Sequence, residues 1–383
     1  MMIENYKIKL KSFQVIEKRQ EDIEVKFNLP AISNFNLLIS DNAQGKTRLF
    51  NIFNFLSNLF SEKPITISTT FAATINFDII APKGNENITY TINIEPENGK
   101  NNYNEQVIRN DRTIYSSREK ILFNETKNAE VKNYFIPQNL PAIVSISECD
   151  FITINLIRDF LQRFVFISAN KTRDIIVDSD SIIPNKNGTN IASVLNNWAR
   201  KYPEIFNEVI NELKECFPFI KKVYFTEKQI PNNILTKVLT IDEKDVTFSI
   251  TQENWADGFY RMLHLLMTPK IPFSSNQKLV PPTLIFIDEI ENGLDFKSLK
   301  FIINYLRDYS DDSQIMIASH SPLICDFVHP ENWIVVRRNG VTLNYLSPKL
   351  IEDDIEKQLD LFKYKHWEFY TKHISNSKNY MAS

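Results

Sequence analysis

The sequence predicts an α/β fold in which a mixed β-sheet lobe carries an antiparallel β subdomain and is joined to a helical lobe. Short apolar strands, such as Asn36–Ile39 and Leu284–Ile287, are each followed by a segment of helical period, as in strand–helix units. Residues 65–125 are rich in Thr, Ile, Tyr and Asn and contain turn signals, which favour an antiparallel meander. Residues 190–215 have helical period and supply the helical lobe.

The other elements follow from hydrophobic period and turn chemistry. At the start of the chain, lysines alternate with Tyr6, Ile8 and Leu10, which predicts a first strand, and a helix is expected over Thr47–Phe60. The remaining elements that we expect are strands over 23–27, 164–168 and 315–318, helices over 153–162, 190–200, 203–215, 253–267 and 296–309, a β section over 219–250, a β pair over 333–346, a loop over 126–141, a polar connection over 170–190, a proline-rich loop over 269–282, and a helical tail.

Composition limits the classes of function. The net charge is −3 at pH 7, so there is no global basic surface and nucleic-acid binding would need a local patch. The three cysteines, Cys149, Cys216 and Cys325, are scattered singly, which favours a reducing cytoplasm over a disulfide or zinc framework. The amino terminus lacks a signal-peptide core, and no run of about 18 apolar residues predicts a membrane span. We therefore expect a cytoplasmic protein with no membrane partner.

The strongest motif is a strand, a tight loop and a helix start that end in Gly45-Lys46-Thr47. Such a turn wraps backbone N–H groups and a helix amino terminus around phosphate oxygens. Lys46 would reach the β- and γ-phosphates of ATP and assist catalysis, and the Thr47 hydroxyl would be a ligand of Mg²⁺. The residues that we expect around the phosphates are Ser40, Asp41, Asn42, Ala43, Gln44, Gly45, Lys46 and Thr47. Ser40 stands where the pattern GxxxxGK[ST] begins with glycine, and the alternative is an ordinary strand–turn–helix.

A second motif places two acids after the buried strand Leu284–Ile287. Ligands of open α/β sheets bind at the carboxyl ends of the strands, which is where Asp288 and Glu289 are expected. Asp288 can hold Mg²⁺, and Glu289 can act as the general base on the attacking water. The alternative is a buried strand that ends in solvated acids, and the upstream Gly45-Lys46-Thr47 makes it less favoured.

Two further motifs depend more on context. His320 follows the apolar strand Ile315–Ala318, 31 residues after Glu289 (320−289), so the two strands are expected to be sheet neighbours. His320 would then stand near the γ-phosphate and hydrogen-bond it or the attacking water. Asp257-Gly258 opens or interrupts an amphipathic helix, and its N–H groups could contact a phosphate on a partner subunit.

Together these motifs resemble those of the ABC-type P-loop ATPases, the group that includes RecF, the SMC heads and compact AAA ATPases related to the OLD family. The phrases IDEIENGL and ASHSPL are similar to those of the compact members. The resemblance assigns Walker A to 40–47, the signature to 255–258, Walker B with the catalytic glutamate to 284–289, the D-loop to 293–295 and the switch histidine to His320. It implies the P-loop NTPase fold of an ABC-type ATPase head.

The resemblance also implies how the chain is organised and what it does. We expect one ATPase domain over 1–383, with an N-terminal P-loop and antiparallel β lobe over 1–150, a helical and β insertion over 151–268, a Walker B and switch-histidine part over 269–347 and a helical tail over 348–383. Two subunits would enclose two ATP molecules, each capped by the partner's Asp257-Gly258 helix, and hydrolysis with Mg²⁺ would loosen the dimer.

Two functions from different classes are consistent with this reading. The first is the ATPase subunit of a bacterial anti-phage defence or DNA-processing system, a homodimer or higher homo-oligomer that works with a separate effector protein and has DNA as a candidate partner. The second is a nucleotide-dependent scaffold with little or no hydrolysis. Ser40 favours the scaffold, whereas His320 and the pair Asp288 and Glu289 disfavour it. A transporter subunit is disfavoured because the signature lacks the sequence LSGGQ.

Overall fold

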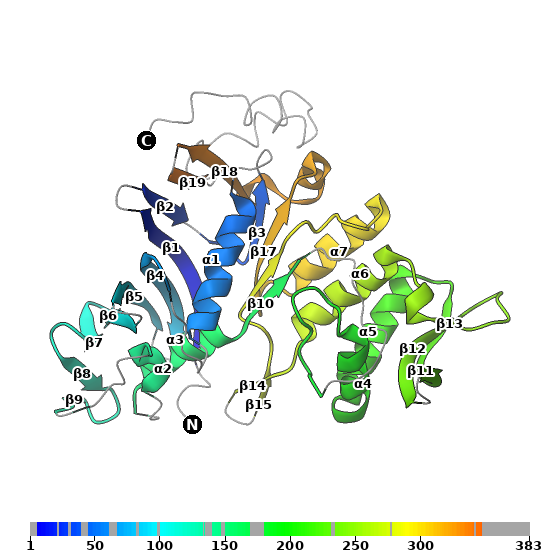
Figure 1. Ribbon diagram of the computed structural model, residues 1–383, viewed down its shortest axis with the longest axis horizontal. Coiled ribbons are helices and arrows are strands. Elements are labelled where there is room, and N and C mark those ends of the chain that lie inside the picture. Colours follow the sequence, from blue (N-terminus) through cyan, green and yellow to red (C-terminus); the bar gives the residue numbers. More distant parts are fainter. Residues whose placement is uncertain are drawn as a thin grey trace. The chain divides into compact units, whose positions relative to one another are not determined.

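The computed structural model describes residues 6–20, 23–29, 32–39, 45–60, 67–81, 84–97, 100–132, 134, 140–146, 150–168, 180–230, 234–275, 278–340 and 342–346. The chain divides into two compact units. The first unit comprises Met1–Phe164 and Pro322–Ser383, and the second comprises Val165–Ser321 (Figure 1). The predicted tail over 348–383 lies outside the described residues, and the boundaries predicted at 150, 268 and 347 stay predictions.

The first unit is built mainly from strands. In chain order its elements are β1 (Lys7–Gln20), β2 (Ile23–Leu29), β3 (Phe35–Ile39), α1 (Lys46–Leu59), β4 (Thr70–Ala81), β5 (Gly84–Glu97), β6 (Lys100–Arg109), β7 (Arg112–Ser116), β8 (Ile121–Asn124), β9 (Ala129–Glu130), α2 (Ala142–Ser145), α3 (Ile152–Gln162), the 3-10 helices η5 (Pro322–Phe327) and η6 (Pro330–Asn332), β18 (Trp333–Asn339) and β19 (Thr342–Leu346).

The strands of the first unit form a mixed sheet in the order β3-β18-β19-β2-β1-β4-β5-β6-β7-β8-β9. The pairs β18–β3 and β19–β2 are parallel, and the strands from β2 to β9 pair antiparallel. The alternation along β4 and β5 follows the expected period of two, so that one face is buried and the other faces outward. The antiparallel meander and the final β pair predicted from the sequence are both confirmed.

Aromatic side chains attach the helices to the buried face of this sheet. The rings of Phe13 in β1 and Phe53 in α1 are stacked with their centroids 4.3 Å apart. Phe77 in β4 and Phe160 in α3 meet edge to face at 5.3 Å. Because a buried aromatic side chain removes a large apolar area from water, these pairs fix α1 and α3 on the sheet.

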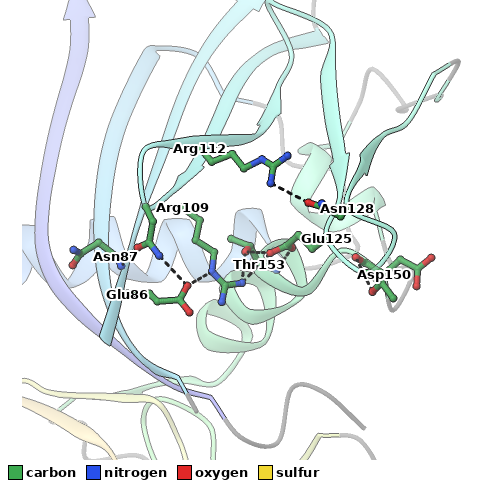
Figure 2. A network of polar contacts seen from close by, with 10 residues as sticks. Glu86, Asn87, Arg109, Arg112, Glu125, Asn128, Asp150 and Thr153 are labelled. Atoms are coloured by element: carbon green, nitrogen blue, oxygen red, sulfur yellow. Dashed lines mark hydrogen bonds and ion pairs between the residues drawn. The ribbon is translucent and has the colours of Figure 1, made fainter. Parts of the chain in front are cut away.

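A polar network attaches the far strands of the meander to the start of α3 (Figure 2). Arg109 in β6 donates from Nε to Glu86 at 2.5 Å and from Nη1 to Glu125 at 2.9 Å. Glu125 accepts from the backbone N–H of Thr153 at 2.6 Å and from the Thr153 hydroxyl at 2.6 Å. Glu125 thus supplies an acceptor to the amino terminus of α3, which begins without a capping side chain of its own.

The second unit combines a short parallel sheet with a helical part. In chain order its elements are β10 (Phe164–Ile167), α4 (Ile191–Lys201), α5 (Pro203–Cys216), β11 (Ile220–Ile230), β12 (Ile234–Glu243), β13 (Ile250–Thr251), η3 (Gln252–Asn254), α6 (Asp257–Met267), η4 (Thr268–Lys270), β14 (Phe273–Ser275), β15 (Lys278–Val280), β16 (Leu284–Ile287), α7 (Phe296–Asp308) and β17 (Gln314–Ser319). Its central strands run in the order β10-β16-β17.

The central strands of the second unit lead to three of the predicted site residues, Asp288, Glu289 and His320. β16 pairs with β17 in parallel, with Ile287 opposite Ile317, which confirms the predicted neighbourhood of the two strands. All residues of β16 and β17 are buried, as expected for strands covered on both faces. The carboxyl ends of β16 and β17 therefore lie at the same edge of the sheet.

Three expectations for local structure need correction. The loop predicted over 126–141 contains the short strand β9, which pairs with β8. The helix predicted from about residue 253 begins at Asp257, because η3 and the extended Ala256 come before it. The proline-rich segment 269–282 is not a plain loop, since β14 and β15 form an antiparallel hairpin inside it. Pro203 stands in the first turn of α5, as predicted. In the described ranges, no helix is long and apolar enough to cross a membrane.

Candidate functional site

The first part of the candidate site is the turn that enters α1. Gly45 has a φ of +104°, a conformation that L side chains rarely adopt. A Cβ atom built on Gly45 would approach Cδ1 of Leu343 to 2.8 Å, so this position is both conformationally and sterically restricted. Ser40, Asp41, Asn42, Ala43 and Gln44 lie outside the described residues. The described part of the loop thus has the backbone conformation of a tight entry into a helix.

The amino terminus of α1 fits an anion. No side chain caps its first N–H groups, and its first turn contains no acidic residue that would oppose a phosphate. Lys46 is 3% exposed, whereas Thr47 is exposed. Backbone N–H groups and the helix dipole both favour negative charge at the amino end of a helix.

The second part of the candidate site follows β16. The backbone N–H of Asp288 donates to the carbonyl of Ile167 in β10 at 2.8 Å, so the sheet ladder continues up to the first acid. Asp288 and Glu289 are half-buried. Glu289 has a φ of +48°, which is uncommon for a residue with a side chain. Residues held in such conformations cluster at functional sites.

An arginine that the sequence analysis did not select holds this bend. Arg261 in α6 donates to the carbonyl oxygens of Ser168, Asp288 and Glu289 at 3.0, 3.1 and 3.3 Å. It is 9% exposed, and burial lowers its pKa to about 10, while the charges of Glu291, Asp288 and Glu289 oppose that lowering. Arg261 therefore stays cationic at neutral pH. Its sequence context, an amphipathic helix, gave no signal for this role.

A glutamate that was also not selected organises the end of β17. Glu291 accepts from the backbone N–H groups of His320 and Ser321 at 2.8 and 3.2 Å, through one carboxylate oxygen. The N–H of Ile290 donates to the carbonyl of Ala318 at 3.4 Å. The turn after β16 and the turn after β17 are thus tied together, and the exposed His320 lies on the same edge as Asp288 and Glu289.

The residues Asp257 and Gly258 open α6 rather than interrupt it. A Cβ atom on Gly258 would lie 2.2 Å from the carbonyl oxygen of Gly293, so no side chain fits there without moving the backbone. Asp295, two residues after Gly293, accepts a hydrogen bond from the N–H of Ser298 at 2.7 Å and caps α7. The glycine at position 258 therefore has a packing reason within the same chain.

The two residues that the sequence predicts as ligands of Mg²⁺ lie in different units, Thr47 in the first and Asp288 in the second. In the described ranges, no group of three or more His, Cys, Asp and Glu side chains could hold a metal ion. Magnesium is usually bound through one or two carboxylates together with the phosphates of the substrate and water. The hydroxyl of Thr47 and the carboxylate of Asp288 are oxygen ligands of the kind that it prefers.

Comparison with protein families is consistent with these features. A family model described as "AAA domain, putative AbiEii toxin, Type IV TA system" matches residues 35–326, more than half of the chain. The chain belongs to this AAA family. The match includes the turn into α1, α6 and the ends of β16 and β17. This AAA domain is an ATPase-type domain, which implies nucleotide binding.

Solved structures show the fold of the AAA domain. It is similar to an SMC head bound to the C-winged helix domain of ScpA, with a TM-score of 0.50 and 12% identity over 90% of this chain and 100% of that chain. The SMC head domain from Thermotoga maritima is 11% identical over 88% of this chain and 98% of that chain, with a TM-score of 0.42. The likeness to the ScpA-bound SMC head confirms the predicted P-loop NTPase fold. A search among curated proteins found no match.

Proposed function

We propose that this AAA domain binds ATP together with Mg²⁺ and hydrolyses it. Lys46 and the N–H groups at the start of α1 bind the phosphates. Thr47 and Asp288 hold the metal, which neutralises charge on the phosphates and orients them. Glu289 is the general base, and His320 hydrogen-bonds the γ-phosphate or the attacking water.

The observation that carries this proposal is the geometry after β16. The backbone there turns at Glu289 into a left-handed conformation, and Arg261 and the sheet ladder fix the residues on either side. Such a bend places a carboxylate just beyond the carboxyl end of a buried strand, where open α/β sheets bind their ligands. A solvated acid at the end of an ordinary strand would need no such support.

In the proposed reaction, Glu289, His320 and Lys46 have different roles. The Glu289 carboxylate accepts the proton of the attacking water, and its fixed backbone limits the positions in which it can do so. The exposed imidazole of His320 orients the same water or the phosphoryl oxygen. Lys46 adds positive charge where negative charge develops during phosphoryl transfer.

We further propose that the domain works as a nucleotide-driven dimer switch. Asp257 and Gly258, at the start of α6, would contact the nucleotide of a partner subunit. Support comes from the amino terminus of α6, where no side chain caps the helix and the helix dipole favours negative charge. The output would lie in a separate effector protein, with DNA as a second candidate partner.

The setting that we propose is a bacterial defence system. The description of the matching family, with its AbiEii-type toxin and Type IV TA system, supports an anti-phage or toxin–antitoxin role over other uses of an ATPase head. DNA processing is the alternative that the SMC-like fold leaves open.

The experiment that tests hydrolysis compares the wild type with Glu289→Gln. We expect steady phosphate release from the wild type and a loss of about 100-fold or more in the variant, with binding of ATP retained, because the base is removed while the phosphate contacts stay. ATP binding without phosphate release in the wild type would instead support a nucleotide-dependent scaffold.

The dimer switch has its own test. The mass of the Glu289→Gln protein is measured by light scattering with and without ATP and Mg²⁺. We expect ATP to shift the protein from monomer to dimer. A mass that does not respond to ATP would contradict the switch.

A further inference from the structure

Arg261 connects the helix α6 to the segment that carries the proposed catalytic base. Its guanidinium reaches three carbonyl oxygens on two separate parts of the chain, Ser168 after β10 and the consecutive residues Asp288 and Glu289 after β16. A planar guanidinium with five N–H donors suits such a multiple contact, and the more compact ammonium of lysine does not.

The carbonyls that Arg261 binds belong to the bend at Glu289. The carbonyl of Glu289 also accepts from the N–H of Asn292 at 3.0 Å, which closes the turn on its other side. A non-glycine residue in the left-handed region is retained only where the surroundings enforce it. Arg261, which lies outside the turn, holds Glu289 in this conformation through its hydrogen bonds to the carbonyls of Asp288 and Glu289.

A second contact joins α6 to the same turn. Gly258, one turn before Arg261 on the helix, lies against the carbonyl of Gly293, and no Cβ atom would fit between them. The first turn of α6 therefore touches one end of the segment 288–293, and Arg261 binds the other end. A shift of α6 along its axis would act on both ends of this segment.

Charge adds to the geometry. The carboxylates of Asp288, Glu289 and Glu291 stand near the buried guanidinium and help to keep it charged. A buried cation that both donates hydrogen bonds and faces acids is costly to remove, because the groups that it satisfies are left without compensation.

We propose that Arg261 is a positioning residue that fixes the backbone of Glu289. The inference deepens the proposed ATPase function and rests on it. It gives Arg261 a role in turnover and not in the affinity for nucleotide, since its contacts are to carbonyl groups of the protein.

The test uses the full chain with Arg261→Met and Arg261→Lys. Methionine keeps an apolar stem but has no donor, whereas lysine keeps the charge and up to three donors. We expect kcat to fall about 10- to 100-fold with methionine, as for other residues that orient a reacting group, and the KM for ATP to change less than about 3-fold. Lysine should restore part of the lost kcat.

Arg158→Met is the matched control. Arg158 in α3 is a half-buried arginine of the first unit that also donates to a backbone carbonyl, that of Ile146 at 2.8 Å. Its loss should lower the melting temperature and leave kcat within about 2-fold of the wild type. An Arg261→Met protein that melts no lower than the Arg158→Met control and turns over like it would overturn the inference.

A second readout separates this inference from the proposed function. Hydrogen exchange of the peptides that contain 286–294 is measured in the wild type and in both Arg261 variants without nucleotide. Exchange of 286–294 that is clearly faster in Arg261→Met, slightly faster in Arg261→Lys and unchanged in Arg158→Met supports positioning by Arg261. This holds even if the wild type releases no phosphate, a result that would refute the ATPase proposal. If the wild type hydrolyses ATP and hydrogen exchange of 286–294 is the same in the wild type and the Arg261 variants, the inference is refuted and the ATPase proposal stands. If Arg261→Met does not fold, Arg261→Lys is judged by the same criteria.

Discussion

The turn into α1 and the turn after β16 are built in different ways. In the first turn, Gly45 has a positive φ, which glycine adopts readily, and the helix begins at the next residue, Lys46. The second places a residue with a side chain, Glu289, in a left-handed conformation and depends on Arg261 from a helix 28 residues earlier in the chain. The proposed phosphate site is thus encoded in a few consecutive residues, whereas the position of the proposed base depends on residues far away in the sequence.

This difference predicts a division between binding and turnover. Lys46→Met should weaken ATP binding about 10- to 100-fold, because a hydrogen bond to a charged group contributes about 1.5–3 kcal/mol. Glu289→Gln should leave binding intact. Binding is measured by titration with a fluorescent ATP analogue, and Lys201→Met, at the exposed end of α4, serves as the control. Equal affinities of the wild type and Lys46→Met would remove Lys46 from the site.

Gly258→Ala tests how rigidly the second turn is supported. The added methyl group would meet the carbonyl oxygen of Gly293, a backbone atom that cannot rotate away. We expect the free energy of unfolding to fall by about 3 kcal/mol, at the upper end for overpacking, as measured by urea denaturation. Asp257→Ala, at the exposed neighbouring position, should change it by less than about 1 kcal/mol. A stable Gly258→Ala protein would show that α6 can move away from the turn.

Gly45→Ala should cost less than Gly258→Ala, because the atoms that it meets belong to a side chain. We expect a loss of about 2 kcal/mol, from the positive φ and the contact with Leu343 together. Gly84→Ala is the matched control, since Gly84 has a φ of +128° and no atom within 4 Å of its added Cβ. The loss of stability in Gly84→Ala therefore measures the cost of a positive φ without a steric clash.

A double-mutant cycle with Leu343→Ala separates the two parts of the Gly45 effect. If the clash matters, Gly45→Ala should cost about 1 kcal/mol less in the Leu343→Ala background than in the wild type. Additive effects of the two substitutions would show that the backbone conformation alone restricts position 45.

The same contrast explains what the sequence predicted. Apolar runs that end in charged residues, such as Leu284–Ile287 before Asp288, determine the strands and their carboxyl ends, because buried parallel strands read as continuous apolar segments. The motif Gly45-Lys46-Thr47 could also be predicted, because consecutive residues form the turn and the start of α1. Hydrophobic period has no information on which carbonyl a distant arginine will reach, so Arg261 was not predicted.

Two other features escaped prediction because they depend on tertiary contacts. The hairpin of β14 and β15 lies in a segment whose prolines favour a loop. Glu105 lies in a polar stretch of β6 and looks solvated, yet it is 2% exposed. It accepts from the hydroxyl of Tyr90 at 2.8 Å and from the N–H of Ala142 at 2.5 Å, and both donors come from other elements.

One buried acid in the first unit and one buried histidine in the second have shifted pKa values, and the two shifts have opposite consequences for stability. Burial raises the pKa of Glu105 in the first unit to about 7 and lowers the pKa of His264 in the second unit to about 3. For Glu105, the folded state binds the proton more tightly, so its contribution to stability is present at low pH and is lost as pH rises from about 4.5 to 7. For His264, the contribution is present above about 6.5 and is lost as pH falls.

Glu105→Gln should therefore remove the loss of stability on the alkaline side and leave the acid side to His264. The free energy of unfolding is measured with urea at pH 5, 6, 7 and 8. Between pH 5 and 7 the wild type should lose up to about 1.4 kcal/mol per pH unit relative to the variant, the limit for one proton. The nearby phenols of Tyr90, Tyr103 and Tyr115 stay neutral in this range, since burial raises their pKa values. Glu95→Gln, at an exposed position of β5, should keep the wild-type slope, and a Glu105→Gln protein with that same slope would mean that Glu105 is ionised in the folded protein throughout the range.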